Sequence, residues 1–170
     1  IGSFSAASNV TGIITDTVAV STLLHEHRAL SLWDYAAAAP YVPIEMGSSA
    51  DGNLAYKDAI FISPHKLIGG PGTPGVLVAR RELFTNRVPD VPGGGTVRYV
   101  STAEHDYLPE IEHREEAGTP AIIESIRAGL VFQLKDAVGP AVIEARESDF
   151  VRRAITSWSK NANINVLGSH

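Results

Sequence analysis

The sequence predicts an α/β fold with a mainly parallel β-sheet, one antiparallel strand and flanking helices. Short apolar segments at residues 1–5, 29–33 and 59–63 read as strands, and a helical pattern separates the first two. Such alternation is typical of parallel sheets with right-handed crossovers. The connection from 59–63 to a fourth apolar segment, 75–79, is too short for a crossover helix, which indicates an antiparallel pair.

The first helix is expected from Thr15 or Asp16, either of which can cap it, to about His27. Further along, Thr119-Pro120 predicts an N-cap with proline in the first turn of a second helix, which Gly139 would end. Its apolar residues recur at helical spacing and are expected to face the core: Ile123, Ile126, Leu130, Leu134 and Val138.

The remaining segments are assigned by their local patterns. Residues 81–85 suggest a helical turn, and residues 97–100 suggest an extended strand. The polar stretch 101–118 is expected to be a loop. Pro140 starts a third helix, to about Trp158.

Composition narrows the function classes. The 170 residues are 44% hydrophobic and 19% charged, as expected of a folded domain with a core. The net charge is −5 and the basic residues are dispersed, so no nucleic-acid footprint is visible. The absence of cysteine excludes disulfides and thiolate sites within these residues, and no apolar run is long enough for a membrane span.

Polar residues follow three successive predicted strands. Ser8 and Asn9 follow the first strand, Asp34 ends the second, and Ser63-Pro64-His65-Lys66 follows the third. In parallel sheets, ligands bind beyond the carboxyl ends of the strands, so these residues would line one crevice. A lysine just past a buried strand is either a surface side chain that extends into solvent or a nucleophile for Schiff-base chemistry.

A carboxylate and an amine across one crevice suit pyridoxal 5'-phosphate (PLP) chemistry. Lys66 would hold the cofactor aldehyde as an imine, and Asp34 would pair with the pyridine nitrogen and keep it protonated. Ser63 and His65 would bind the phosphate. The alternatives are a turn or capping role for Asp34 and a loop hydrogen bond for His65. A metal site is not expected, because its candidate ligands read better as a solvated loop: Glu104, His105, Asp106 and His113.

Five motifs together resemble the class V aminotransferases, and most closely the cysteine desulfurases and selenocysteine lyases. They occur in the family's order between Ser3 and about Leu134: Ser8-Asn9-Val10-Thr11-Gly12, Trp33-Asp34-Tyr35-Ala36, Ser63-Pro64-His65-Lys66, Gly93-Gly94-Gly95 and Glu116-Ala117-Gly118-Thr119-Pro120.

The resemblance implies the central part of a PLP-dependent transferase large domain of the aspartate-aminotransferase type. It implies that Lys66 is the catalytic Schiff-base lysine and moves a proton to and from the substrate. Asp34, Ser63 and His65 would bind PLP, Asn9 would lie near its ring hydroxyl, and the substrate would be an amino acid. Thr119 would reach the phosphate of the partner subunit's cofactor in a homodimer.

The expected organisation is residues 1–139 in the large domain, 140–160 as a connecting helix and 161–170 as the start of a small C-terminal domain. Because both ends fall in strand-like segments, the chain is expected to be an internal fragment, inactive alone. No nucleic acid or membrane partner is expected.

One departure from the family pattern keeps rival functions open. Ala37 stands where the family often has a glutamine that bonds the ring hydroxyl, and the desulfurase cysteine would lie beyond His170. An epimerase or true aminotransferase of the same class, or a catalytically silent domain of this fold, therefore remains an alternative.

Overall fold

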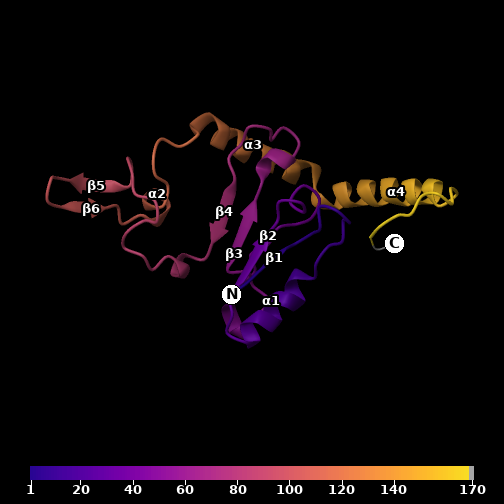
Figure 1. The fold of residues 1–170 in the computed structure, drawn as a ribbon, viewed down its shortest axis with the longest axis horizontal. Helices are drawn as coiled ribbons and strands as arrows, with labels where there is room; N and C mark the ends of the chain where they lie inside the picture. Colours follow the sequence, from indigo (N-terminus) through magenta and orange to yellow (C-terminus); the bar gives the residue numbers. More distant parts are fainter. Residues whose placement is uncertain (169–170) are drawn as a thin grey trace.

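The computed structural model describes residues 1–168, and its centre is a four-stranded sheet in the order β1-β2-β3-β4 (Figure 1). The strands are β1 (Gly2–Ser5), β2 (Ser31–Asp34), β3 (Ala59–Ile62) and β4 (Val76–Ala79). β1 pairs parallel with β2 and β2 pairs parallel with β3, whereas β3 and β4 are antiparallel. The predicted α/β class and the single antiparallel strand are confirmed.

Helix α1 (Thr17–Glu26) connects β1 to β2 as the crossover of a parallel pair. Asp16 caps it, because its Oδ1 accepts the Ala19 N–H at 2.9 Å, as the sequence predicted. Arg28 then turns the chain with a φ of 56°. This turn delays β2 to Ser31, two residues beyond the expected start of the strand.

The core lies on the sheet face that carries Trp33, Ile60 and Ile62. Small side chains of the segment after β2 pack against it and let the chain pass close to the sheet. The buried hydrophobic cluster comprises Ala6, Ala7, Trp33, Tyr35, Ala38, Ala39, Ile60, Ile62, Leu67 and Val131.

Helix α3 (Ile122–Val138) begins later than the sequence indicates. Ala121 is its N-cap and no side chain caps it, so the predicted cap by Thr119-Pro120 is wrong. The Gly118 N–H donates to the Gly94 carbonyl at 2.7 Å, and Gly118 has a φ of 88°. This contact directs residues 119–121 across the molecule before the helix can start. Gly139, with a φ of 86°, ends the helix as predicted.

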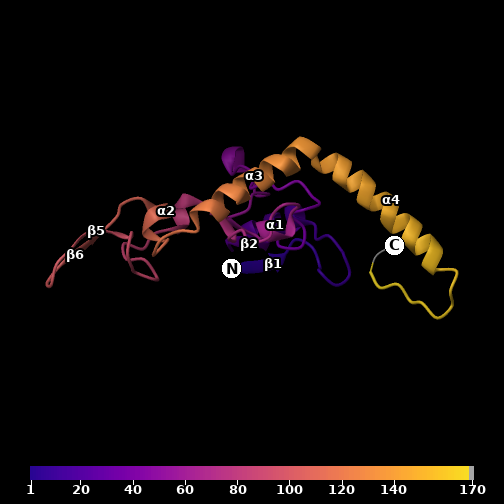
Figure 2. The same ribbon diagram turned by 90° about the horizontal axis from the view of Figure 1, so that it is seen from above.

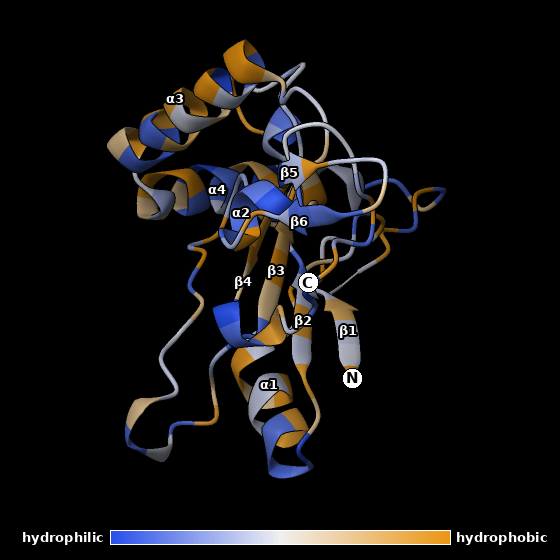
Figure 3. Ribbon diagram, turned by 90° about the vertical axis from the view of Figure 1, so that its left-hand side faces the viewer, coloured by the Kyte–Doolittle hydropathy of each residue, from blue (hydrophilic) through white to orange (hydrophobic). Residues whose placement is uncertain are grey.

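The apolar stripe of α3 does not face the core, so that prediction is also wrong. Ala128 and Val131 are the buried residues of the helix. Small Ala128 lets the helix approach the glycine-rich segment after β3, and the larger side chains turn outward. Figure 3 colours much of the helix as apolar. Its exposed apolar residues are Ile122, Ile123, Ile126, Leu130, Leu134 and Val138.

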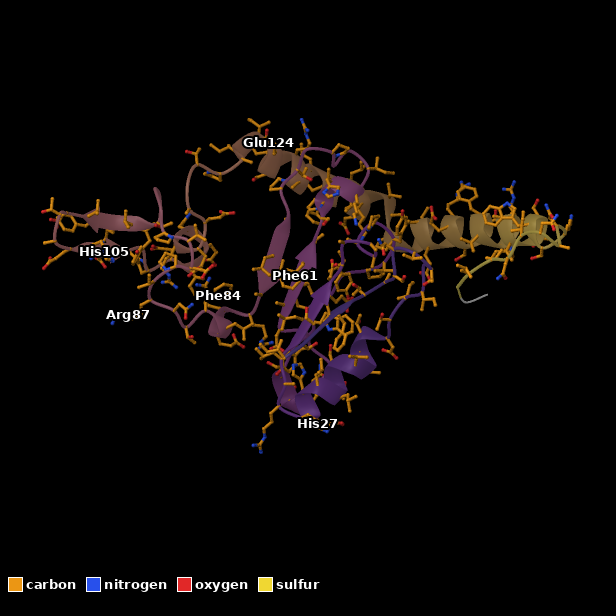
Figure 4. The ribbon with its side chains drawn as sticks, viewed as in Figure 1. His27, Phe61, Phe84, Arg87, His105 and Glu124 are labelled. Carbon is orange, nitrogen blue, oxygen red and sulfur yellow. The ribbon has the colours of Figure 1, made fainter. Side chains whose placement is uncertain are left out.

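The stretch 101–118 contains regular structure where a loop was expected. Strand β5 (Val97–Val100) pairs antiparallel with β6 (His105–Tyr107), and Arg98 and Asp106 form an ion pair across the pair. A short helix, α2 (Ile111–Arg114), follows. The hairpin lies far from the sheet, as His105 and Phe61 show in Figure 4. Pairing with β5 explains how a polar segment becomes a strand.

Helix α4 (Pro140–Trp158) begins at the predicted proline and extends away from the sheet (Figure 2). Its role as a connecting helix stays a prediction. Residues 161–168 contain no helix or strand, and the end of the predicted small-domain segment lies outside the described residues. Within residues 1–168, no helix has the length and hydropathy needed to cross a membrane.

Candidate active site

The carboxyl ends of β1, β2 and β3 meet at one edge of the sheet. The register aligns Ser5 with Asp34, and Asp34 with Phe61. Asp34 therefore ends the middle strand, between the loop that follows β1 and the turn that follows β3. This edge carries five of the six predicted site residues: Asn9, Asp34, Ser63, His65 and Lys66.

Asp34 is fixed by its backbone and keeps one side-chain oxygen available. Its carbonyl accepts the Ala6 N–H at 2.9 Å, and its Oδ1 accepts the Ala36 N–H at 2.7 Å. Its Oδ2 accepts no hydrogen bond from the part of the chain that the structure describes. The side chain is exposed, so a ligand that donates a hydrogen bond can reach it.

Tyr35 turns inward directly after Asp34. Its side chain is buried, and this burial raises the pKa of the phenol above its ordinary value. The nearby Glu45 carboxylate adds to the rise, whereas the hydrogen bond with Thr17 opposes it. The Tyr35 N–H donates to the Phe61 carbonyl at 2.8 Å, which joins the end of β2 to β3. A neutral tyrosine therefore anchors the chain beneath the Asp34 carboxylate.

Lys66 ends a tight 3-10 turn, η2 (Pro64–Lys66), directly after β3. Its backbone N–H donates to the Ser63 carbonyl at 3.1 Å, which closes the turn. Pro64 and Leu67 are buried on either side, whereas His65 and Lys66 are exposed. Across residues 1–168 no carboxylate forms an ion pair with Lys66. The amine stands on a fixed turn without a charge partner.

Gly70 supports this turn from behind through a contact that only glycine allows. A Cβ at position 70 would lie 1.9 Å from the Pro64 carbonyl oxygen. The helix α3 braces the same loop, because Arg127 Nη1 donates to the Pro71 carbonyl at 2.9 Å. No spacing in the sequence identified Gly70 or Arg127 as supports of the turn.

Gly70→Ala is expected to displace the turn that carries Lys66. Inserting a methyl group into a packed site costs about 1–3 kcal/mol of stability. We expect faster amide hydrogen exchange at Leu67, whose N–H donates to the Pro64 carbonyl at 3.0 Å. The matched control is Gly94→Ala, because a Cβ there has nothing within 4 Å. Equal exchange in both variants would show that Gly70 is not a support.

Asn9 lies in a compact turn after β1. Ser8 Oγ accepts the Val10 and Thr11 N–H groups, each at 3.2 Å, and Gly12 N–H donates to the Ser8 carbonyl at 3.0 Å. Asn9 is exposed on this turn. Asn9 therefore lies at the same edge as Asp34, and among residues 1–168 no hydrogen bond engages its side-chain amide.

Thr119 is not brought to this edge. It is exposed in the segment between α2 and α3, and within residues 1–168 no hydrogen bond links it to Asp34 or Lys66. Its neighbours Gly118 and Pro120 line a separate hollow of about 700 Å³ against β4. Its predicted role toward a partner subunit stays a prediction.

Comparisons with known proteins identify the family of the chain. The family model described as Aminotransferase class-V matches residues 1–170. A probable cysteine desulfurase of Mycobacterium leprae is 31% identical over 165 residues, which cover 97% of this chain and 38% of that protein. A probable cysteine desulfurase of Aeropyrum pernix is 35% identical over 124 residues, covering 70% of this chain and 28% of that protein.

Solved structures show the same fold. The apo cysteine desulfurase of Thermococcus onnurineus superposes with a TM-score of 0.80 at 27% identity, covering 93% of this chain and 38% of that one. A cysteine desulfurase of Escherichia coli gives a TM-score of 0.79 at 24% identity, covering 94% of this chain and 38% of that one.

The fold defines an α/β domain of the kind found in cysteine desulfurase structures. The chain belongs to the class V aminotransferase family. It spans about 38% of the length of the relatives from Mycobacterium leprae and Streptomyces coelicolor.

Proposed function

We propose that the full-length protein is a PLP-dependent enzyme of the cysteine-desulfurase type, which acts on an amino acid through Lys66. The observation that carries this proposal is the placement of Asp34 and Lys66 at adjacent strand ends, set by the parallel register of β2 and β3. The relatives' names support the substrate class.

The side chains at this edge fit the polar groups of PLP. The available Oδ2 of Asp34 suits the pyridine nitrogen, and the unpaired amine of Lys66 suits the aldehyde carbon. The Ser63 hydroxyl and the His65 ring are donors for the phosphate, and the Asn9 amide suits the ring hydroxyl or a substrate carboxylate. In a homodimer, Thr119 of one subunit would reach the phosphate bound by the other.

When bound, PLP supplies an electron sink for the carbanion formed from the substrate. Two residues of the chain would control the protons in this reaction. Asp34 keeps a proton on the ring nitrogen, and Lys66 takes the proton from the substrate α-carbon and returns it. The short turn η2 keeps Ser63, His65 and Lys66 within four consecutive residues.

Ala37 supports the rival proposal of a catalytically silent domain of this fold, and an epimerase or true aminotransferase is the rival within the enzyme class. Its side chain packs against the hydrophobic cluster and presents no polar group to the edge. A direct assay separates the candidates: the full-length protein with PLP and cysteine should release sulfide and alanine. Release of neither, together with transamination or racemisation of another amino acid, would favour the aminotransferase or epimerase. Cofactor binding without any turnover would favour a silent domain.

Asp34→Asn is expected to weaken the function of the bound cofactor. A hydrogen bond to a charged group is worth about 1.5–3 kcal/mol, so kcat/KM should fall about 10- to 100-fold. The absorption spectrum of bound PLP should change as well, since the ring nitrogen loses its anionic partner. The control is Asp51→Asn, at an exposed position with a φ of 55° that asparagine tolerates. A wild-type spectrum for Asp34→Asn would remove Asp34 from the proposal.

A further inference from the structure

A buried polar network lies at the opposite, amino end of the same strands. Ser21 and His25 project from one face of α1, four residues apart. Ser21 Oγ lies 2.6 Å from Ser31 Oγ, and His25 Nε2 lies 2.8 Å from Asp58 Oδ2. The His25 and Asp58 side chains are only 6% and 4% exposed. Neither residue belongs to the proposed active site.

Asp58 is joined to Ser31 twice. The Ser31 N–H donates to Asp58 Oδ2 at 2.8 Å, and the Asp58 N–H donates to the Ser31 carbonyl at 2.9 Å. Ser31 is the first residue of β2, and Asp58 directly precedes β3. These two bonds therefore fix where β3 begins relative to β2.

His25 holds the Asp58 carboxyl in place. The Leu54 carbonyl can only accept, so His25 Nδ1 donates to it across 2.7 Å, and one proton lies between Nε2 and Asp58. The Tyr56 ring stacks on His25 with a centroid separation of 3.9 Å. Arg80, which follows β4, contacts the same group of residues. Its guanidinium lies 4.6 Å from the centroid of the Tyr56 ring, and its backbone N–H donates to the Asp58 carbonyl at 2.9 Å.

The register of β2 and β3 matters because both strands are short. They are paired over Leu32–Ala59, Trp33–Ile60 and Asp34–Phe61. A slip of one residue would shift Lys66 about 3.3 Å relative to Asp34 and turn the apolar side chains of β3 to the wrong face. Three register pairs offer little resistance to such a slip without a fixed end.

We propose that Asp58, held by His25, is a positioning residue that sets the β2–β3 register and hence the relative position of Asp34 and Lys66. The role in fixing the register follows from the network itself. Only its importance for catalysis rests on the proposed function.

Amide hydrogen exchange of the full-length protein tests the register directly. Asp58→Asn should speed exchange at least tenfold at residue 58 and also at Tyr35, whose N–H bonds to Phe61 at the far end of the pair. His25→Gln should raise exchange at the same two amides by a smaller factor. If Asp58→Asn does not fold, the exchange rates of His25→Gln decide the outcome. The Ser125 amide in α3 should keep its wild-type rate.

His27→Gln is the matched control, because His27 is exposed at the end of the same helix (Figure 4). Within the described chain, its ring forms a hydrogen bond only with the Leu23 carbonyl. Unchanged exchange at Tyr35 in the Asp58 and His25 variants would overturn the proposal. So would equally faster exchange at Ser125, which would indicate global destabilisation.

The absorption maximum of bound PLP is a second measurement. It would not change if Asp58 served only the stability of the fold. In folded Asp58→Asn protein, the absorption maximum of bound PLP should shift, and in His27→Gln it should not. If wild-type protein binds no PLP, the proposed function fails, while the exchange rates still decide whether Asp58 sets the register.

Discussion

Lys66→Ala should reduce turnover of the full-length protein by about 10²–10⁴-fold, the range attributed to a positioned general acid or base. The exposed amine on η2 has no ion-pair partner within residues 1–168, so its removal leaves the fold intact. The measurement is the initial rate with saturating PLP and amino acid, together with circular dichroism to confirm folding.

A small primary amine in the buffer should partly restore the rate of Lys66→Ala, since it can accept the substrate proton in place of the missing side chain. The control is Lys160→Ala, at an exposed lysine beyond α4. A Lys66→Ala rate within a few-fold of wild type would remove Lys66 from catalysis.

Trp33→Ala should cause the largest loss of stability, about 3–5 kcal/mol of unfolding free energy, as is typical of buried aromatic residues. Trp33 is fully buried, with 0% of its surface exposed. Its Nε1 donates to Ser21 Oγ at 2.9 Å and to Ser31 Oγ at 2.7 Å. The mutation removes the packing of the ring together with its hydrogen bonds to Ser21 of α1 and Ser31 of β2.

Urea denaturation followed by far-ultraviolet circular dichroism measures this loss without relying on tryptophan fluorescence. Trp158→Ala is the matched control, because Trp158 is 49% exposed on α4 and should lose much less. Similar losses in the two variants would contradict the assignment of the core to the Trp33 side of the sheet.

The sheet could be predicted because strand order and chain direction follow from simple rules. Alternation of strand and helix dictates parallel pairing of β1 with β2, and the short link after Lys66 dictates an antiparallel β4. Parallel pairing then brings Asp34 and Lys66 to one edge. Two residues that are 32 positions apart in the sequence thus reach one edge of the sheet through topology alone.

Features set by distant contacts could not be predicted. The Thr119-Pro120 signal was overruled by the bond from Gly118 to Gly94, which lies 24 residues away in sequence. The helical spacing of the apolar residues correctly predicted that α3 is a helix. The face that turns inward is the one that carries Ala128, which that spacing did not indicate. Likewise, the fit of Gly70 against Pro64 depends on how the loop folds back, and composition alone carries no such information.

The most direct test of the account is covalent trapping of PLP on the full-length protein. After incubation with PLP and reduction with borohydride, peptide mass spectrometry should find the pyridoxyl group on Lys66 at about one per chain. The other lysines, Lys57, Lys135 and Lys160, should remain largely unlabelled. Labelling elsewhere, or none at Lys66, would contradict the proposal that Lys66 is the catalytic lysine.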